Sequence, residues 1–121
     1  MCGFIGQVSY KDIDHNLLEA SNRRIICRGP DEKKSFFGNS TETFNSEEKF
    51  NFSIFFNRLS ILDLTENASQ PMISNKFKTV LLFNGEIYNH KILRQELEKE
   101  GVEFISDHSD SEVVLNGFSY Y

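Results

Sequence analysis

The chain has 121 residues, of which 39% are hydrophobic and 13% aromatic, and its formal net charge is −5 at pH 7. This apolar content is enough to pack one domain over residues 1–121 and argues against a disordered chain. The acidic balance repels phosphate backbones, which argues against nucleic acid as a partner. No apolar run is long enough to cross a bilayer, and the first residues do not resemble a signal peptide. We therefore expect a cytoplasmic protein that does not bind membranes.

The first half of the chain predicts strands around one helix. Residues 2–10 have the pattern of a strand, and Asp14 is suited to cap a helix that runs to about residue 26. The segment Arg28 to Asp31 ends this helix, because proline cannot continue it. Further strands are predicted at residues 35–38, 41–44 and 52–56, the first two as a hairpin.

The second half predicts another strand and two helices. The strand covers residues 79–83 and ends at Asn84-Gly85, a pair that favours positive φ. One helix runs from an Asn89 cap to about residue 100, and Gly101 stands where a helix C-cap glycine belongs. Ser109 to Glu112 has the spacing of a capping box that opens the last helix.

A short strand over residues 103–105 completes the pattern, and the mixture of elements predicts the α+β fold class. The chain ends on Tyr120-Tyr121, soon after its last helix begins. Aromatic side chains at a terminus need covering, so we expect the sequence to be the N-terminal part of a longer protein.

Cys2 is the first residue with possible chemistry. Excision of Met1 would leave Cys2 with a free α-amine, whose pKa of about 8 in model peptides leaves a useful neutral fraction near neutral pH. That amine can act as the base for the thiol of the same residue. The alternative is a cysteine near the terminus that only packs.

Asn84-Gly85 and Arg58 offer two further functions. A side-chain amide and the next backbone N–H at a strand end can stabilise an oxyanion, although an ordinary Asn-Gly turn is the better explanation of the pair taken alone. Arg58 follows an apolar strand and suits a bidentate contact with a carboxylate, or else forms a surface pair with an acid such as Asp63. Asp110 can bind an ammonium group, or it can simply complement the dipole of its helix. The scattered histidines predict no metal site.

Several segments in order along the chain resemble the glutaminase domain of glutamine-hydrolysing asparagine synthetases, which are class II glutamine amidotransferases of the N-terminal-nucleophile hydrolase fold. The matching segments are Met1 to Gly6, Arg28 to Asp31, Arg58 to Leu64, Gln70 to Met72, Phe83 to His90 and Ser109 to Leu115. Cys27 and Phe55-Phe56-Asn57 depart from the family pattern, which carries histidine at or near these positions.

The resemblance implies a role for each matching residue. Cys2 would attack the side-chain amide of glutamine, and Asn84 with the Gly85 N–H would hold the oxyanion of the γ-glutamyl intermediate. Arg58 would bind the α-carboxylate of glutamine, helped by backbone groups of Ile61 and Leu62. Glu86 and Asp110 would bind the α-ammonium group.

The resemblance also implies a larger assembly. The family domain is a layered αββα fold longer than this chain, so we expect the fold to be incomplete at the C-terminus and the synthetase domain to be absent. The glutaminase step needs no cofactor, whereas ATP and Mg²⁺ would belong to the synthetase domain, in the same longer chain or in a partner protein.

Three alternatives remain open: a truncated or degenerate fragment without activity, an amidotransferase acting on a sugar or envelope carboxylate, and an amidohydrolase of the same fold acting on other amides.

Overall fold

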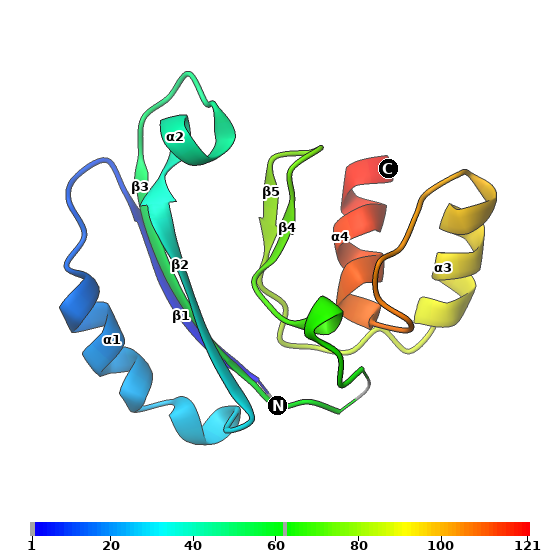
Figure 1. The fold of residues 1–121 in the computed structure, drawn as a ribbon, viewed down its shortest axis with the longest axis horizontal. Coiled ribbons are helices and arrows are strands. Elements are labelled where there is room, and N and C mark those ends of the chain that lie inside the picture. Colours follow the sequence, from blue (N-terminus) through cyan, green and yellow to red (C-terminus); the bar gives the residue numbers. More distant parts are fainter. Residues whose placement is uncertain (1, 62) are drawn as a thin grey trace. The chain divides into compact units, whose positions relative to one another are not determined.

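A computed structural model describes residues 2–61 and 63–121, and the chain separates into two compact units, Met1–Leu59 and Ser60–Tyr121. Both units combine helices with strands (Figure 1), which confirms the predicted α+β class. Each unit has its own sheet, one of three strands and one of two.

The first unit is an antiparallel sheet with a helix on one face. Its strands follow the spatial order β1-β3-β2. Its elements are β1 (Gly3–Ser9), α1 (His15–Arg23), a 3₁₀ turn η1 (Ile26–Arg28), β2 (Glu32–Asn39), α2 (Ser40–Phe44) and β3 (Asn51–Arg58). The central strand β3 pairs with β1 through Gly3 opposite Asn57, and with β2 through Glu32 opposite Arg58.

The helix α1 begins as predicted but ends earlier. The Leu17 N–H donates to Asp14 Oδ1 over 3.0 Å, which is the predicted cap. The helix stops at Arg23 rather than near residue 26. The amides of Arg24 and Ile25 bond to carbonyls three residues back, at 3.1 and 3.0 Å, so the last turn tightens into 3₁₀ geometry.

The side chains of β3 alternate between two different environments, as a pleated strand requires. On one face, Ser53 and Asn57 bond to residues of α1, which lies along this face in Figure 1. On the other face, Phe56 stacks on Phe4 of β1 with ring centroids 6.4 Å apart, and Phe52 packs against Phe36 of β2. The sheet therefore has one helix-covered face and one aromatic face.

The predicted strand at residues 41–44 is wrong, because this segment is the short helix α2. The Glu42 N–H donates to Asn39 Oδ1 over 2.9 Å, an N-cap that starts a helix in place of a hairpin turn. Asn45 ends the helix with a left-handed φ of 52°. The strand that pairs with β2 is β3.

The second unit packs a small hairpin against the last helix. Its elements are a 3₁₀ turn η2 (Glu66–Ala68), β4 (Met72–Ser74), β5 (Thr79–Leu81), α3 (His90–Lys99) and α4 (Asp110–Tyr120). The hairpin and α3 lie on either side of α4 (Figure 1). Ala68, Met72 and Leu115 form a buried cluster, and Leu81 packs against it.

Several predictions in this unit need correction. The strand β4 was not predicted, β5 ends at Leu81 rather than residue 83, and residues 103–105 form no strand. The carbonyl of Glu103 accepts a bond from the Asn116 side chain, and the Ile105 N–H donates to Glu112, so side chains of α4 bond to this backbone. Neither Asn89 nor Ser109 makes the predicted side-chain cap. Gly101 has a φ of +84°, which confirms the C-cap.

Candidate active site

Cys2 lies just before β1, and its thiol contacts backbone groups of Leu59, the residue that follows β3. The Leu59 N–H donates to Cys2 Sγ over 3.3 Å, and Sγ lies 3.6 Å from the Leu59 carbonyl oxygen, to which the thiol can donate. The side chain of Arg28 donates from Nε to the Cys2 carbonyl over 3.3 Å. The thiol is half-buried and is therefore both positioned and reachable.

Arg58 is the last residue of β3 and is 7% exposed, so it is not the surface arginine that the sequence left open. Its Nη1 lies 3.3 Å from Glu32 Oε2, on the residue directly opposite in the sheet register. The Arg58 carbonyl accepts a bond from the Asp31 N–H over 3.0 Å. The guanidinium is thus held at the end of the central strand, one residue from the backbone that contacts Cys2.

The loop Arg28 to Asp31 has a role that its sequence pattern did not reveal. A Cβ on Gly29 would lie 2.2 Å from the Asn57 carbonyl oxygen, so only glycine lets the loop approach β3 this closely. The same loop donates hydrogen bonds to the backbones of Cys2 and Arg58. The loop therefore does more than end α1, because its hydrogen bonds fix the backbones of Cys2 and Arg58.

Asn84, Gly85 and Glu86 lie in the second unit, in an exposed segment between β5 and α3. Neither Asn84 nor Gly85 is among the described residues with positive φ, and neither lies in a hydrogen-bonded turn, so the ordinary turn that the sequence left open does not form. Within the described part of this unit, the Asn84 amide makes no hydrogen bond. Its donors are therefore available to a ligand, and a Cβ on Gly85 would lie 2.8 Å from the Phe83 ring.

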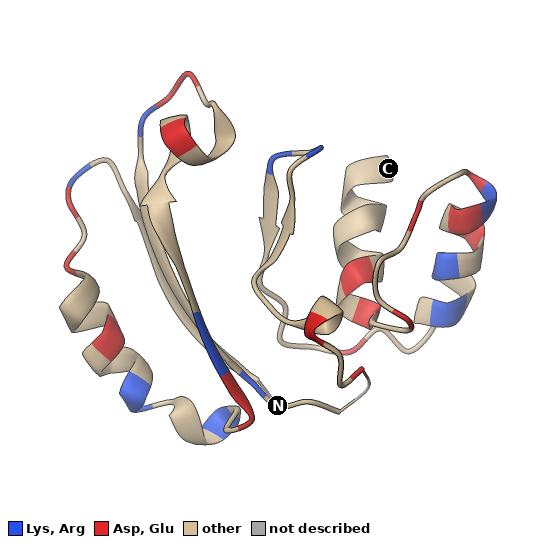
Figure 2. Ribbon diagram, in the orientation of Figure 1, with Lys and Arg blue, Asp and Glu red and all other residues tan. Residues whose placement is uncertain are grey.

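Asp110 is the first residue of α4 and is 7% exposed. Its Oδ2 accepts a hydrogen bond from the Ile87 N–H over 3.0 Å. Figure 2 shows acidic residues at this end of α4, where they complement the helix dipole. Asp110 therefore both begins its helix and holds the segment that contains Glu86.

Gln70 belongs to the segment Gln70 to Met72, from which the sequence predicted no function for this side chain. Its side chain is 5% exposed and bonds in both directions to Phe83, donating to the carbonyl over 3.0 Å and accepting from the N–H over 2.6 Å. It also donates to Ser111 Oγ over 3.2 Å. Gln70 therefore fixes the backbone immediately before Asn84. A buried amide cannot be distinguished from an exposed one by sequence alone.

The candidate residues divide between the units. Cys2 and Arg58 belong to the first unit and lie close together. Asn84, Gly85, Glu86 and Asp110 belong to the second unit, linked through Ile87. Ile61 is 70% exposed in the second unit, and Leu62 lies outside the described residues.

Asp63 is a buried carboxylate beside the candidate residues of the second unit. Burial raises its pKa, but hydrogen bonds from the Thr65 hydroxyl, the Thr65 N–H and the His108 N–H outweigh burial and lower the pKa below its ordinary 3.8. The Thr65 hydroxyl and N–H lie 2.7 and 2.9 Å from Oδ1. Asp63 therefore remains charged, and the hydrogen bonds that it accepts connect Thr65, at the start of this unit, with His108.

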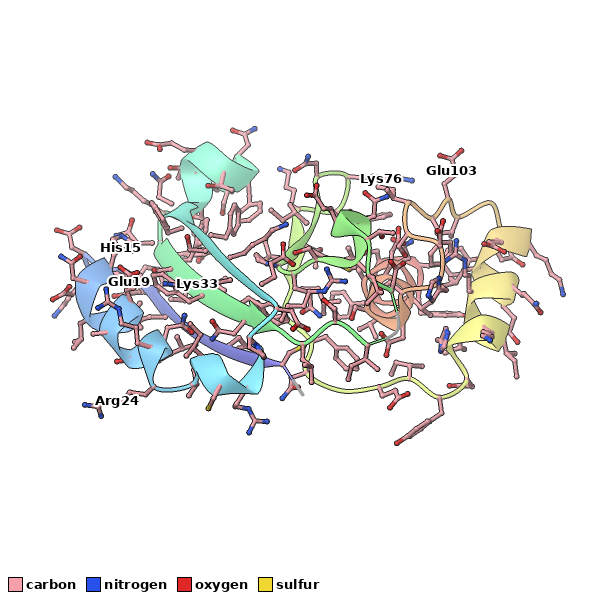
Figure 3. The ribbon with its side chains drawn as sticks, turned by 60° about the horizontal axis from the view of Figure 1, so that its bottom comes forward. His15, Glu19, Arg24, Lys33, Lys76 and Glu103 are labelled. Carbon is pink, nitrogen blue, oxygen red and sulfur yellow. The ribbon has the colours of Figure 1, made fainter. Side chains whose placement is uncertain are left out.

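A cavity of about 320 Å³ lies between α1 and β2 in the first unit. Figure 3 shows His15 and Glu19 of α1 near Lys33 of β2. Lys33 Nζ lies 3.0 Å from Glu19 Oε1 and also faces the Phe55 ring. The lining residues are His15, Asn16, Glu19, Lys33, Lys34, Ser35, Phe37 and Phe55. The lysine and the glutamate neutralise one another, so the cavity presents no unpaired charge from this pair.

Residues 2–61 and 63–121 contain no group of three or more His, Cys, Asp or Glu side chains that could hold a metal ion. Within the same residues, no helix has the length and apolar character needed to cross a membrane.

Comparison with known proteins gives a consistent result along the whole chain. Residues 1–121 match the family model of the glutamine amidotransferase domain. The chain is 36% identical to asparagine synthetase (glutamine-hydrolysing) 1 of Bacillus subtilis over 126 residues, covering 100% of this chain and 18% of that protein. It is 31% identical to asparagine synthetase 2 of the same organism and 30% identical to a probable asparagine synthetase of Dictyostelium discoideum, with 96% of this chain covered in each case.

These matches show that the chain is part of an enzyme class, the glutamine amidotransferases. The chain belongs to the glutamine amidotransferase domain family. It spans less than a fifth of the length of these relatives, at 18%, 14% and 19%.

Proposed function

We propose that this chain hydrolyses glutamine to glutamate and ammonia through a thioester on Cys2. The sulfur attacks the amide carbon, the α-amine of Cys2 moves the thiol proton to the departing nitrogen, and ammonia leaves. Water then attacks the γ-glutamyl thioester, releasing glutamate and restoring the thiol. The mechanism requires removal of Met1, because an acylated amine on Cys2 cannot accept the proton.

The single observation that carries this proposal is the contact between Cys2 and the end of β3. The Leu59 N–H donates to Cys2 Sγ over 3.3 Å, and the next residue towards the N-terminus is the buried Arg58. The nucleophile just before β1 and the cationic side chain at the end of β3 thus lie at the same end of two paired strands. This arrangement suits a substrate that carries both a carboxylate and a reactive amide.

The remaining substrate contacts follow from charge and hydrogen-bonding capacity. Arg58 binds the α-carboxylate, and the backbone near Ile61 and Leu62 assists it. The free amide of Asn84 and the Gly85 N–H stabilise the oxyanion, a contribution worth roughly a hundredfold to a thousandfold in rate per donor.

Glu86 and Asp110 bind the α-ammonium group. The exposed Glu86 carboxylate is open to such a ligand, while Asp110 keeps one oxygen bonded to the Ile87 N–H. An amide without both charged groups would lose its contact with Arg58 or with Glu86 and Asp110, which supports selectivity for glutamine.

The wider assembly is part of the same proposal. The names of the relatives, glutamine-hydrolysing asparagine synthetases, support delivery of ammonia to a synthetase domain, in the same longer chain or in a partner. We propose in addition that this domain uses ATP and Mg²⁺ and that aspartate is the acceptor. The family match also supports the layered αββα arrangement of N-terminal-nucleophile hydrolases. No cofactor is needed for the glutaminase step itself.

The test is ammonia release from glutamine by the full-length protein and by its Cys2→Ser and Asn84→Ala variants, together with an intact mass. We expect Cys2→Ser to lose activity by about a thousandfold or more, and Asn84→Ala by roughly a hundredfold. The mass should show that Met1 is absent. Retained activity in Cys2→Ser, or an active protein that still carries Met1, would refute the mechanism.

A second measurement separates this proposal from hydrolysis of other amides. The carboxylate-free analogue of glutamine, aminobutanamide, offers the same amide and amine but nothing for Arg58. Equal turnover of the two compounds would favour a general amidohydrolase over a glutamine-specific enzyme.

A further inference from the structure

We infer that the buried side-chain pair Asn22–Asn57 is a positioning device, which holds Arg58 in register to bind the α-carboxylate of glutamine. This inference rests on the proposed glutaminase function, and it assigns a task to residues outside the motifs shared with the family.

The two amides bond to one another in both directions. Asn57 Nδ2 donates to Asn22 Oδ1 over 2.6 Å, and Asn22 Nδ2 donates to Asn57 Oδ1 over 3.2 Å. Both residues are 0% exposed. Asn22 lies in the last turn of α1 and Asn57 is the penultimate residue of β3, so the pair fastens the helix to the end of the central strand.

Asn57 is also the residue on which the other parts of the first unit converge. In the sheet it stands opposite Gly3, the neighbour of Cys2, and on its other side opposite Lys33. Its carbonyl group lies against Gly29, where no Cβ would fit. A shift of Asn57 would therefore displace the strand end, the loop after α1 and the start of β1 together.

Arg58 follows directly, and its side chain leaves the strand on the opposite face. Its guanidinium pairs with Glu32 over 3.3 Å and is largely shielded from solvent. Apolar contacts alone would allow β3 to slide slightly against α1, because they are not directional. Two opposed amide hydrogen bonds specify one position, and a small displacement would misplace the arginine relative to a bound carboxylate.

The pair can be tested apart from its contribution to stability. Removing one asparagine leaves its partner buried and unbonded, which destabilises the fold, whereas replacing both with apolar residues largely avoids this penalty. The variants are Asn22→Leu, Asn57→Leu and the double variant, all in the full-length protein. The matched control is Ser40→Ala, which removes the bonds of an equally buried side chain near the other end of β3.

Two thiol probes give the readout. The diazo-ketone analogue of glutamine, diazo-oxo-norleucine, should label Cys2 with a half-saturating concentration that depends on Arg58. Iodoacetamide should label Cys2 without using Arg58. Melting temperatures report the stability of each variant.

We expect both single variants to melt at lower temperature and to need roughly tenfold more diazo-ketone for half-saturation. The double variant should regain most of the lost melting temperature. The diazo-ketone concentration that gives its half-maximal labelling should nevertheless stay raised by roughly tenfold. The rate of iodoacetamide labelling should change by less than about threefold. Ser40→Ala should lose stability without a change in half-saturation.

Half-saturation that returns to the wild-type value in the double variant would show that the pair contributes only stability. A parallel loss of iodoacetamide labelling would show general disruption of the site, and either result would overturn the inference. If the diazo-ketone does not label Cys2 in the wild type, the proposed function itself fails, which is a distinguishable outcome.

Discussion

Arg58 combines burial with a fixed carboxylate partner, and both properties determine what a substitution there will do. Its planar guanidinium can hold Glu32 and still present a second edge to a substrate. A lysine at this position carries the same charge, but as a point charge without the second edge. The difference should therefore appear in substrate binding rather than in the chemical step.

We expect Arg58→Lys to raise the KM for glutamine by roughly 30- to 150-fold with a much smaller change in kcat, because it loses about 2–3 kcal/mol of charge-assisted hydrogen bonding. The measurement is steady-state ammonia release. Arg23→Lys is the matched control, because the Arg23 side chain is 72% exposed and only pairs with Glu19 within α1. An unchanged KM in Arg58→Lys would contradict the assigned role.

Asp63 leads to a prediction about pH. Its pKa in the folded protein lies below the ordinary 3.8, so its charge contributes stability that is complete above pH 3.8 and is lost as the pH falls through the lower folded-state value. The advantage in melting temperature of the wild type over Asp63→Asn should therefore stay constant down to about pH 4 and shrink below it. If the difference in melting temperature between the wild type and Asp63→Asn stays the same down to the lowest pH, the carboxylate does not act through its charge.

At the scale of the elements, two short motifs act by holding one stretch of backbone close to another. The loop Arg28 to Asp31 reaches β3 because Gly29 has no side chain, and Gln70 holds the end of the β5 segment by pairing with Phe83. In both cases a residue with no proposed role in the reaction fixes the backbone next to a residue that has one. Substitutions in these elements should therefore act first on stability and geometry.

Two glycines make this prediction specific. Gly29→Ala should destabilise the first unit by about 3 kcal/mol, because its Cβ would lie 2.2 Å from a backbone oxygen that cannot easily move. Gly117→Ala in α4 should instead stabilise by up to about 1 kcal/mol, since its Cβ meets only Leu97 at 3.9 Å and alanine favours helix.

Amide hydrogen exchange on the full-length protein resolves the effect of each change within its own unit. Faster exchange in β3 of Gly29→Ala and slower exchange in α4 of Gly117→Ala are the expected results. Unchanged exchange in β3 would mean that the loop relaxes without cost, and the close packing would then have no energetic consequence.

At the scale of the whole molecule, the proposed function assigns the use of ammonia to a synthetase domain, in the same longer chain or in a partner. In the longer protein, Cys2→Ala should abolish glutamine-dependent asparagine formation while ammonia-dependent formation stays within about twofold, because only the source of nitrogen is lost. Cys27→Ala is the matched control, since this cysteine is free and exposed. Loss of both activities in Cys2→Ala would argue against separate glutaminase and synthetase steps.

Local patterns predicted much of the fold, and they failed where a local cap was overlooked or where a contact outside the segment decided the outcome. The helix after Asp14, the strand β3 and the Gly101 cap all follow from signals within a few residues. The segment at 41–44 has strand-like residues but becomes helical, because Asn39 caps it. The capping box at Ser109 does not form, because Glu112 bonds to the amides of Ile105 and Ser106.

The candidate site was predicted unevenly for the same reason. The motifs around Cys2, Arg58 and Asn84 could be named because their residue types suit the chemistry and resemble a family. The roles of Gly29 and Gln70 could not be assigned, since each depends on which backbone lies within contact distance. Whether Asn84-Gly85 forms a tight turn was likewise open until the backbone angles were known.

What the amino-acid sequence determined by itself was the α+β class, the family and the residues capable of the reaction, because these depend on residue type and order. What only the tertiary structure decided was the Cys2–Leu59 contact, the Arg58–Glu32 ion pair and the Asn22–Asn57 pair. The physical reason is separation: these contacts join residues 26 to 57 positions apart, and only the packing of the strands and the helix brings them within hydrogen-bonding distance.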